Sequence, residues 1–138
     1  MIQFIAEGVN LPLLHKIKIK TWIKETVSVY GKKTGDIAFI FCSDERILEI
    51  NNKYLNHNYF TDVITFDYTE NSCISGDIFI SVDTVKSNAE ELNVSFDLEL
   101  KRVLIHGILH LCGQDDKTPE TKSEMTKKEN VALENYKE

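Results

Sequence analysis

The chain has 138 residues, of which 42% are hydrophobic and 28% are charged, and its formal net charge is −6 at pH 7. Such a composition is typical of a globular protein, and the length suits one domain with a hydrophobic core. The acidic total excludes an evenly basic surface of the kind that many nucleic-acid binders have. A local basic face remains open, because lysines gather early in the chain at Lys16, Lys18, Lys20, Lys24, Lys32 and Lys33.

No run of the sequence approaches the ~20 apolar residues that a membrane helix requires. The first residues have no basic start followed by a long apolar core, so we expect no secretory signal and no membrane partner. The three cysteines form no Cys-x-x-Cys pair. We therefore expect reduced thiols in a cytoplasmic protein, with Cys112 as a small buried hydrophobe.

Hydrophobic periodicity predicts strands over residues 2–6, 37–42, 63–66 and 76–80. It predicts helices over residues 11–30, 43–54, 81–92, about 96–112 and 118–136, with Ser43, Ser81 and Thr118 as N-caps. Residues 56–59 and 67–75 are predicted loops. Residues 37–42 are apolar on both sides, as in a central strand that is covered on both faces. The prediction is one α+β domain over residues 1–138, with a mixed sheet of about four strands packed with about five helices.

The end of the fourth helix carries the pattern His-x-x-x-His-x-x-Gly-x-x-Asp, formed by His106, His110, Gly113 and Asp116. Histidines four residues apart lie on one helix face, where both imidazoles can reach one ion. A glycine often ends a helix in a left-handed conformation, which would let the chain turn back and bring Asp116 to the same ion. Histidine pairs also occur on ordinary half-buried helices, but the glycine stop and the acid beyond it favour a metal site.

Two nitrogen ligands and one oxygen ligand leave a tetrahedral Zn²⁺ ion one open position, which is the arrangement of a catalytic site. We therefore expect one Zn²⁺ per chain. The same ligand set also suits Ni²⁺, Fe²⁺ or Mn²⁺.

Three stretches resemble the YbeY family of bacterial rRNA maturation endoribonucleases. Residues 106–116 are similar to its His-Gly-x-Leu-His-Leu-x-Gly-Tyr-Asp-His signature, with Asp116 at the place of the last histidine. Residues 61–66 resemble its Thr-Asp-Val-Leu-Ser-Phe strand, and residues 76–81 its Gly-Asp-Ile-x-Ile-Ser strand. Because their order and separations also agree, the resemblance covers nearly the whole chain.

The resemblance implies a zincin-like metal helix and a metal-dependent hydrolase that cleaves phosphodiester bonds in single-stranded RNA. Its role would be late small-subunit rRNA maturation and ribosome quality control. The implied partner is small-subunit ribosomal RNA, with ribosomal proteins or an assembly GTPase as further partners. His106, His110 and Asp116 would be the metal ligands, and His106 a catalytic residue.

The chain departs from the family at Leu55, where the family places an arginine implicated in activity. A substrate phosphate would lose a bidentate donor there. Lys53, His57 and Arg46 are candidate replacements. We assign substrate binding to Lys53, His57 and Tyr59, the last because an aromatic ring can stack on a base.

Two other functions share parts of this pattern. Metzincin peptidases use the same ligand spacing, but they need a glutamate general base directly after the first histidine, where this chain has Gly107. A metal-stabilised assembly factor that binds ribosomal proteins or RNA without cutting is the second alternative. The loss of the arginine at Leu55 and the acidic total charge favour this non-catalytic alternative.

Overall fold

The computed structural model describes residues 1–55 and 62–137, with the side chain of Leu55 outside the described part. This part contains the four strands and five helices that the sequence predicts. In chain order they are β1 (Ile2–Ala6), α1 (Lys16–Val29), β2 (Lys33–Cys42), α2 (Asp44–Leu55), β3 (Val63–Asp67), β4 (Cys73–Ser81), α3 (Val82–Leu92), α4 (Phe96–Leu111) and α5 (Pro119–Glu134).

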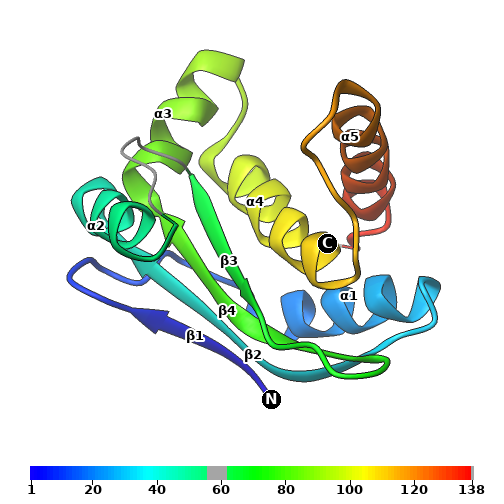
Figure 1. The fold of residues 1–138 in the computed structure, drawn as a ribbon. Helices are drawn as coiled ribbons and strands as arrows, with labels where there is room; N and C mark the ends of the chain where they lie inside the picture. The colour runs from blue at the N-terminus through cyan, green and yellow to red at the C-terminus, as the bar shows by residue number, and fades with distance from the viewer. Residues whose placement is uncertain (56–61, 138) are drawn as a thin grey trace.

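The strands form one sheet in the order β1-β2-β4-β3 (Figure 1). β1 and β4 are both parallel to β2, whereas β3 runs antiparallel to β4. The sheet is therefore mixed, as predicted, and β2 is one of its two central strands.

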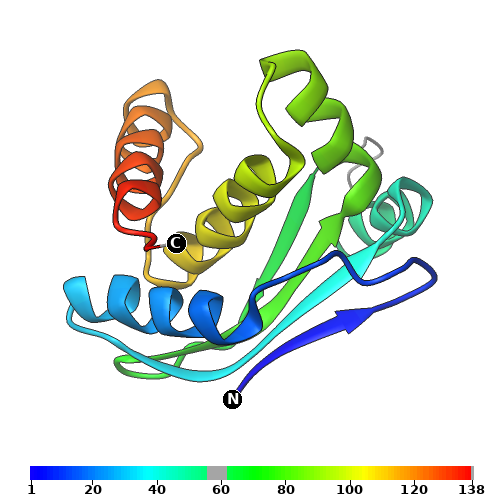
Figure 2. The same ribbon diagram turned by 180° about the vertical axis from the view of Figure 1, so that it is seen from behind.

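Helices pack on both faces of the sheet, because successive side chains of a strand point to opposite faces. On one face Phe39 of β2 and Ile78 of β4 belong to the main core, to which α1 and α4 contribute. On the other face Phe79 packs against a smaller cluster that contains Ile47 of α2 and Ile64 of β3. Figures 1 and 2 show α2 and the pair α1 and α4 on opposite sides of the sheet.

A glycine lets α4 lie close against β4. A Cβ atom on Gly107 would lie 2.9 Å from Cγ2 and 3.0 Å from Cδ1 of Ile78. Real Cβ atoms essentially never approach other atoms to 2.9 Å, so a larger residue at 107 would require the helix or the Ile78 side chain to shift. The close approach fixes the depth at which α4 presents its neighbouring residues.

The predicted start of the first helix at residue 11 is wrong, because α1 begins at Lys16. Leu11 precedes Pro12, and the proline ring disfavours helical geometry in the residue before it. Leu11 and Leu14 pack against the main core from a non-helical segment, while Leu13 between them is 99% exposed.

Two strands begin earlier than predicted. β2 starts at Lys33 instead of residue 37, and β4 starts at Cys73 within the predicted loop 67–75. Lys33 and Thr34 pair with Cys73 and Ile74, and a register shift separates this pairing from the one that resumes at Ile37. Polar residues before Ile37 conceal this part of the strand from a hydrophobicity pattern.

The three cysteines are free thiols, as predicted. Cys112 is partly buried rather than buried, and it packs at the edge of the main core. Burial raises the pKa of its thiol to about 11, so the thiol remains protonated at neutral pH. None of the helices within residues 1–55 and 62–137 is long and apolar enough to cross a membrane.

Candidate metal centre

The glycine stop after α4 has the predicted geometry. Gly113 adopts a φ of +99°, and its N–H donates to the carbonyl of His110 at 2.9 Å. The N–H of Gln114 donates to the carbonyl of Leu109 at 3.0 Å. These two bonds form a Schellman motif, which turns the chain back across the last turn of the helix.

This reversal brings the three predicted ligands together. The Nε2 atoms of His106 and His110 lie 3.0 Å apart, and Oδ2 of Asp116 lies 3.3 Å from each of them. All three side chains are partly buried, with 21%, 27% and 34% of their surface exposed. His106, His110 and Asp116 thus form a small triangle of partly buried donor atoms.

The triangle has the dimensions of a tetrahedral metal site. Two ligand atoms that each lie about 2.0–2.1 Å from a tetrahedral ion are about 3.3 Å apart. The observed separations of 3.0 and 3.3 Å match this value. Imidazole and carboxylate are also ordinary ligand types for zinc, so these residues fit the ion that the sequence predicts.

Hydrogen bonds on the far side of each imidazole direct Nε2 into the triangle. Nδ1 of His106 lies 2.5 Å from Oε2 of Glu129, and Nδ1 of His110 lies 3.0 Å from the carbonyl oxygen of Gln114. Carboxylate and carbonyl oxygens only accept, so both Nδ1 atoms carry the hydrogen. Two Nε2 lone pairs 3.0 Å apart repel one another unless a cation lies between them.

The pKa values of the two histidines shift in opposite directions. Burial lowers the pKa of His106, but the hydrogen bond and charge of Glu129 outweigh it, aided by Asp116 and Asp62, so that this pKa lies above its ordinary value. Burial and the charge of His106 hold the pKa of His110 below its ordinary value. In the metal-free protein the pair thus shares one proton more readily than it accepts two.

The neighbouring acid, Asp115, lies outside the donor triangle and has a structural role. Its Oδ1 accepts the backbone N–H groups of Asp116 at 2.7 Å and Lys117 at 3.2 Å. The Asp115 carboxylate therefore stabilises the turn that presents Asp116, in agreement with the choice of Asp116 as the ligand.

Gln114 ties the turn to α5. Its side-chain amide donates to the carbonyls of Asp115 and Thr121, and its Oε1 accepts from the Lys128 ammonium group at 2.5 Å. Thr118 then starts α5 with a capping box that includes Thr121, and Pro119 occupies the first turn, as the sequence predicts. The loop that carries Asp116 is thus fixed at both ends.

Sequence reasoning missed the residues behind His106. Glu129 of α5 is 8% exposed at its side chain and contacts both His106 and Arg102. A signal for it exists: Met125, Glu129 and Ala132 are the buried residues of α5 and follow helical spacing, so Glu129 is a charged residue within an otherwise apolar stripe.

Two more acids lie in this region with a raised pKa. Burial raises the pKa of Asp62, against the opposing charge of His106. Burial also raises the pKa of Glu99, with a further contribution from the charge of Asp62. Buried carboxyl groups near an imidazole pair are a feature of functional sites.

The predicted substrate-binding residues are described only in part. Lys53 lies in the last turn of α2, where its ammonium group is 5.2 Å from the ring centroid of Tyr54. His57 and Tyr59 lie outside the described residues. Arg46, the other candidate for the role of the missing arginine, is paired with Glu7 at 2.6 Å and Glu49 at 3.2 Å.

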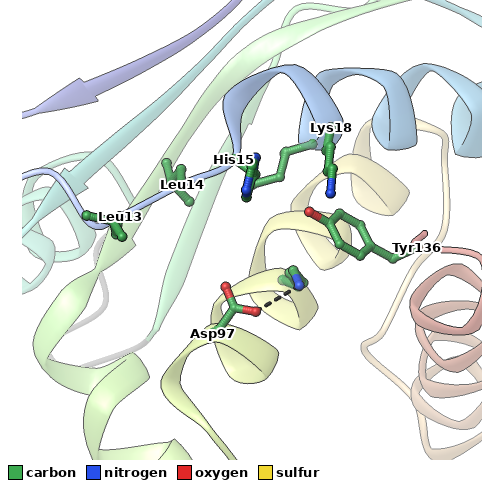
Figure 3. A pocket seen from close by; sticks show the side chains of 8 residues that line it. Leu13, Leu14, His15, Lys18, Asp97 and Tyr136 are labelled. Atoms are coloured by element: carbon green, nitrogen blue, oxygen red, sulfur yellow. Dashed lines mark ion pairs between the residues drawn. The ribbon is translucent and has the colours of Figure 1, made fainter. Parts of the chain in front are cut away.

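A separate pocket of about 440 Å³ lies between the start of α1, the first half of α4 and the end of the chain. Figure 3 shows its polar side chains, among them His15, Lys18 and Tyr136. Lys101 is paired with Asp97 at 2.8 Å, and its ammonium group lies 3.9 Å from the ring centroid of Tyr136. This pocket contains no residue of the His106, His110 and Asp116 triangle.

Known proteins with similar sequences share one description. A relative from Parabacteroides distasonis, named endoribonuclease YbeY, is 55% identical over 132 residues, which are 96% of this chain and 93% of the relative. A relative of the same name from Phocaeicola vulgatus is 56% identical and covers 96% of both chains. One from Porphyromonas gingivalis is 48% identical over 96% of this chain and 87% of the relative.

A solved structure supports the fold. The solution structure of a Thermotoga maritima protein superposes with a TM-score of 0.66 at 31% sequence identity, over 97% of this chain and 87% of that one. The model of the endoribonuclease YbeY family matches residues 9–137. The resemblance seen in the three sequence motifs is thereby confirmed, and the chain belongs to the endoribonuclease YbeY family.

Proposed function

We propose that this protein is a metal-dependent endoribonuclease that cleaves phosphodiester bonds in single-stranded RNA. The observation that carries the proposal is the triangle of His106, His110 and Asp116 donor atoms, 3.0–3.3 Å apart, in a chain of the YbeY family. We infer that residues 1–138 form one functional domain that holds one Zn²⁺ ion.

His106, His110 and Asp116 would hold the ion, and the coordination position that three protein ligands leave open would take a phosphate group. A divalent ion bound there supplies a Lewis acid for a phosphoryl oxygen and lowers the pKa of a coordinated water. His106 is the proposed catalytic residue among the ligands, since its partner Glu129 is charged. Lys53, His57 and Tyr59 remain the proposed contacts to RNA.

The proposed biological role is late maturation of small-subunit ribosomal RNA and ribosome quality control in the cytoplasm, where this RNA is processed. Ribosomal proteins or an assembly GTPase are the proposed further partners. The family assignment supports this role through the endoribonuclease activity that the relatives' names state.

Peptidase chemistry receives no support from the geometry of α4. A peptidase of the metzincin kind needs a glutamate at position 107. A Cβ atom at this position would already meet Ile78 at 2.9 Å, so a side chain there would be directed at β4. The site has neither the general base nor the space for one.

The test compares the native protein with a variant in which His106 and His110 are both changed to Ala. Zinc content by elemental analysis and cleavage of a single-stranded ribosomal RNA fragment are measured on the same samples. We expect about one zinc per chain and RNA cleavage in the native protein, and neither in the variant. His15→Ala, a change at an exposed histidine in the separate pocket, should retain both.

Cleavage that survives in the double variant without bound metal would reject the proposed mechanism. Native protein that holds zinc and binds the RNA, but leaves it intact at catalytic protein concentrations, would instead identify the non-catalytic assembly factor.

A further inference from the structure

Glu129 contributes to the metal centre without being part of the ligand pattern. It lies on α5, 23 residues after His106, yet its Oε2 is 2.5 Å from Nδ1 of that histidine. The Glu129 side chain is 8% exposed, and its two oxygen atoms contact His106 and Arg102. A carboxylate oxygen in this position accepts, so Nδ1 of His106 carries the hydrogen between them.

Arg102 determines the direction of this carboxylate. Its Nη1 donates to Oε1 of Glu129 at 2.9 Å, and its Nη2 donates to Oδ1 of Asn130 at 2.9 Å. Arg102 precedes His106 by four residues, so both side chains leave the same face of α4. With Oε1 held by the guanidinium group, Oε2 is the oxygen left for His106.

The two histidines consequently differ in the group that accepts the hydrogen bond from Nδ1. His106 donates to a charged carboxylate, whereas His110 donates to the neutral carbonyl of Gln114 at 3.0 Å. A carboxylate behind an imidazole fixes its tautomer and ring orientation and makes the opposite nitrogen a stronger electron donor than a carbonyl does. The contact also joins the ligand helix to a helix that carries no ligand.

We propose that Glu129 is a positioning residue of the metal centre: held by Arg102, it fixes the orientation of His106 and strengthens its bond to the ion. The inference rests on the proposed metal site but not on the RNA substrate. It makes α5 a functional part of the site.

The experiment measures zinc affinity of the full chain by competition with a chromogenic chelator, together with the visible spectrum of the cobalt-substituted protein. Glu129→Gln keeps the size of the side chain and removes its charge. We expect about ten- to a hundredfold weaker zinc binding and a changed cobalt spectrum. Arg102→Lys, which keeps the charge but loses the two-pronged contact, should weaken binding by a smaller factor.

Two control variants separate positioning from stability. Glu134→Gln removes an exposed acid of the same helix and should leave zinc affinity unchanged. Ala132→Gly loosens α5 where the indole of Trp22 donates to the Ala132 carbonyl at 2.7 Å, away from the donor triangle. It should lower the melting temperature and leave the cobalt spectrum intact.

Wild-type zinc affinity and an unchanged cobalt spectrum in Glu129→Gln would overturn the proposal. Equal losses of affinity in Glu129→Gln and Ala132→Gly would also overturn it, because general loosening of α5 would then account for the effect. A native protein whose zinc affinity depends on Glu129 but that cuts no RNA would refute the proposed function and leave this inference standing.

Discussion

At the scale of single residues, the contact between Glu129 and His106 has a pH dependence that can be measured in metal-free protein. Folding raises the pKa of His106, so the protonated imidazole stabilises the folded state. This contribution to the unfolding free energy is complete below the ordinary histidine pKa of about 6.5 and is lost as the pH rises through the folded-state pKa. Folding lowers the pKa of Glu129, so the charged carboxylate stabilises the folded state. This contribution is complete above the ordinary glutamate pKa of about 4.3 and is lost as the pH falls through the folded-state pKa.

Both groups are charged only between these limits. We therefore predict that the unfolding free energy of the native protein exceeds that of Glu129→Gln by the largest amount between about pH 4.5 and 6.5. Part of the difference should persist at pH 8, since Arg102 still pairs with the carboxylate. Urea unfolding with excess chelator at a series of pH values measures this, and a difference that is constant from pH 4 to pH 8 would contradict it.

The clustering of His106, His110 and Asp116 was predictable from residue spacing, but the contact behind His106 was not. Four-residue spacing places His106 and His110 on one helix face whatever the rest of the chain does. Glu129 meets His106 only because α5 packs along α4, which is a tertiary contact between residues distant in sequence. No local pattern encodes that contact, although an acid in a buried stripe marks the position.

At the scale of elements, the contact between α4 and β4 explains why residue 107 is glycine. Alanine would favour the helix by about 1 kcal/mol. Overpacking against Ile78 costs about 1–3 kcal/mol, because the nearest atoms belong to its fully buried side chain. We predict that Gly107→Ala lowers the unfolding free energy by up to about 2 kcal/mol, measured by urea unfolding.

A double-mutant cycle tests the cause of this loss. Ile78→Ala alone should cost about 2–5 kcal/mol by leaving a cavity. Adding Gly107→Ala to it should cost nothing or restore stability, since the new methyl group then has space. Strictly additive losses would show that the two residues do not compete for the same volume.

The elements also show where local patterns fail. Strand and helix types were predictable from apolar runs, side-chain alternation and helix caps, and the caps at Ser81 and Thr118 mark real helix starts. The errors lie at boundaries that tertiary packing decides. Leu11 and Leu14 look helical by spacing, but they reach the core from a non-helical segment.

At the scale of the whole molecule, the proposed metal centre lies where α4, the following loop and α5 meet. His106 and His110 come from α4, Asp116 from the following loop, and Glu129 ties the first histidine to α5. The other end of α5 is held to α1, where Trp22 stacks edge-on against Tyr136 at 5.2 Å and donates to the Ala132 carbonyl. An ion that binds the folded site therefore stabilises the contacts among several elements.

Zinc should consequently raise the stability of the whole domain. A ligand that binds only the folded state adds about 2.7 kcal/mol at a free concentration of one hundred times its dissociation constant. For a domain of this size we predict that zinc at this concentration raises the melting temperature by about 10 °C over protein with excess chelator. The whole chain should unfold in one transition, so circular dichroism gives one melting temperature for each sample.

The variant with His106 and His110 changed to Ala is the control, and its melting temperature should not respond to zinc. In Glu129→Gln the shift at the same zinc concentration should be smaller, because about tenfold weaker binding removes about 1.4 kcal/mol of the added stability. An equal shift in the native protein and the double variant would mean that zinc acts elsewhere on the chain. The change of melting temperature with zinc thus tests both the donor triangle and the contact between Glu129 of α5 and His106.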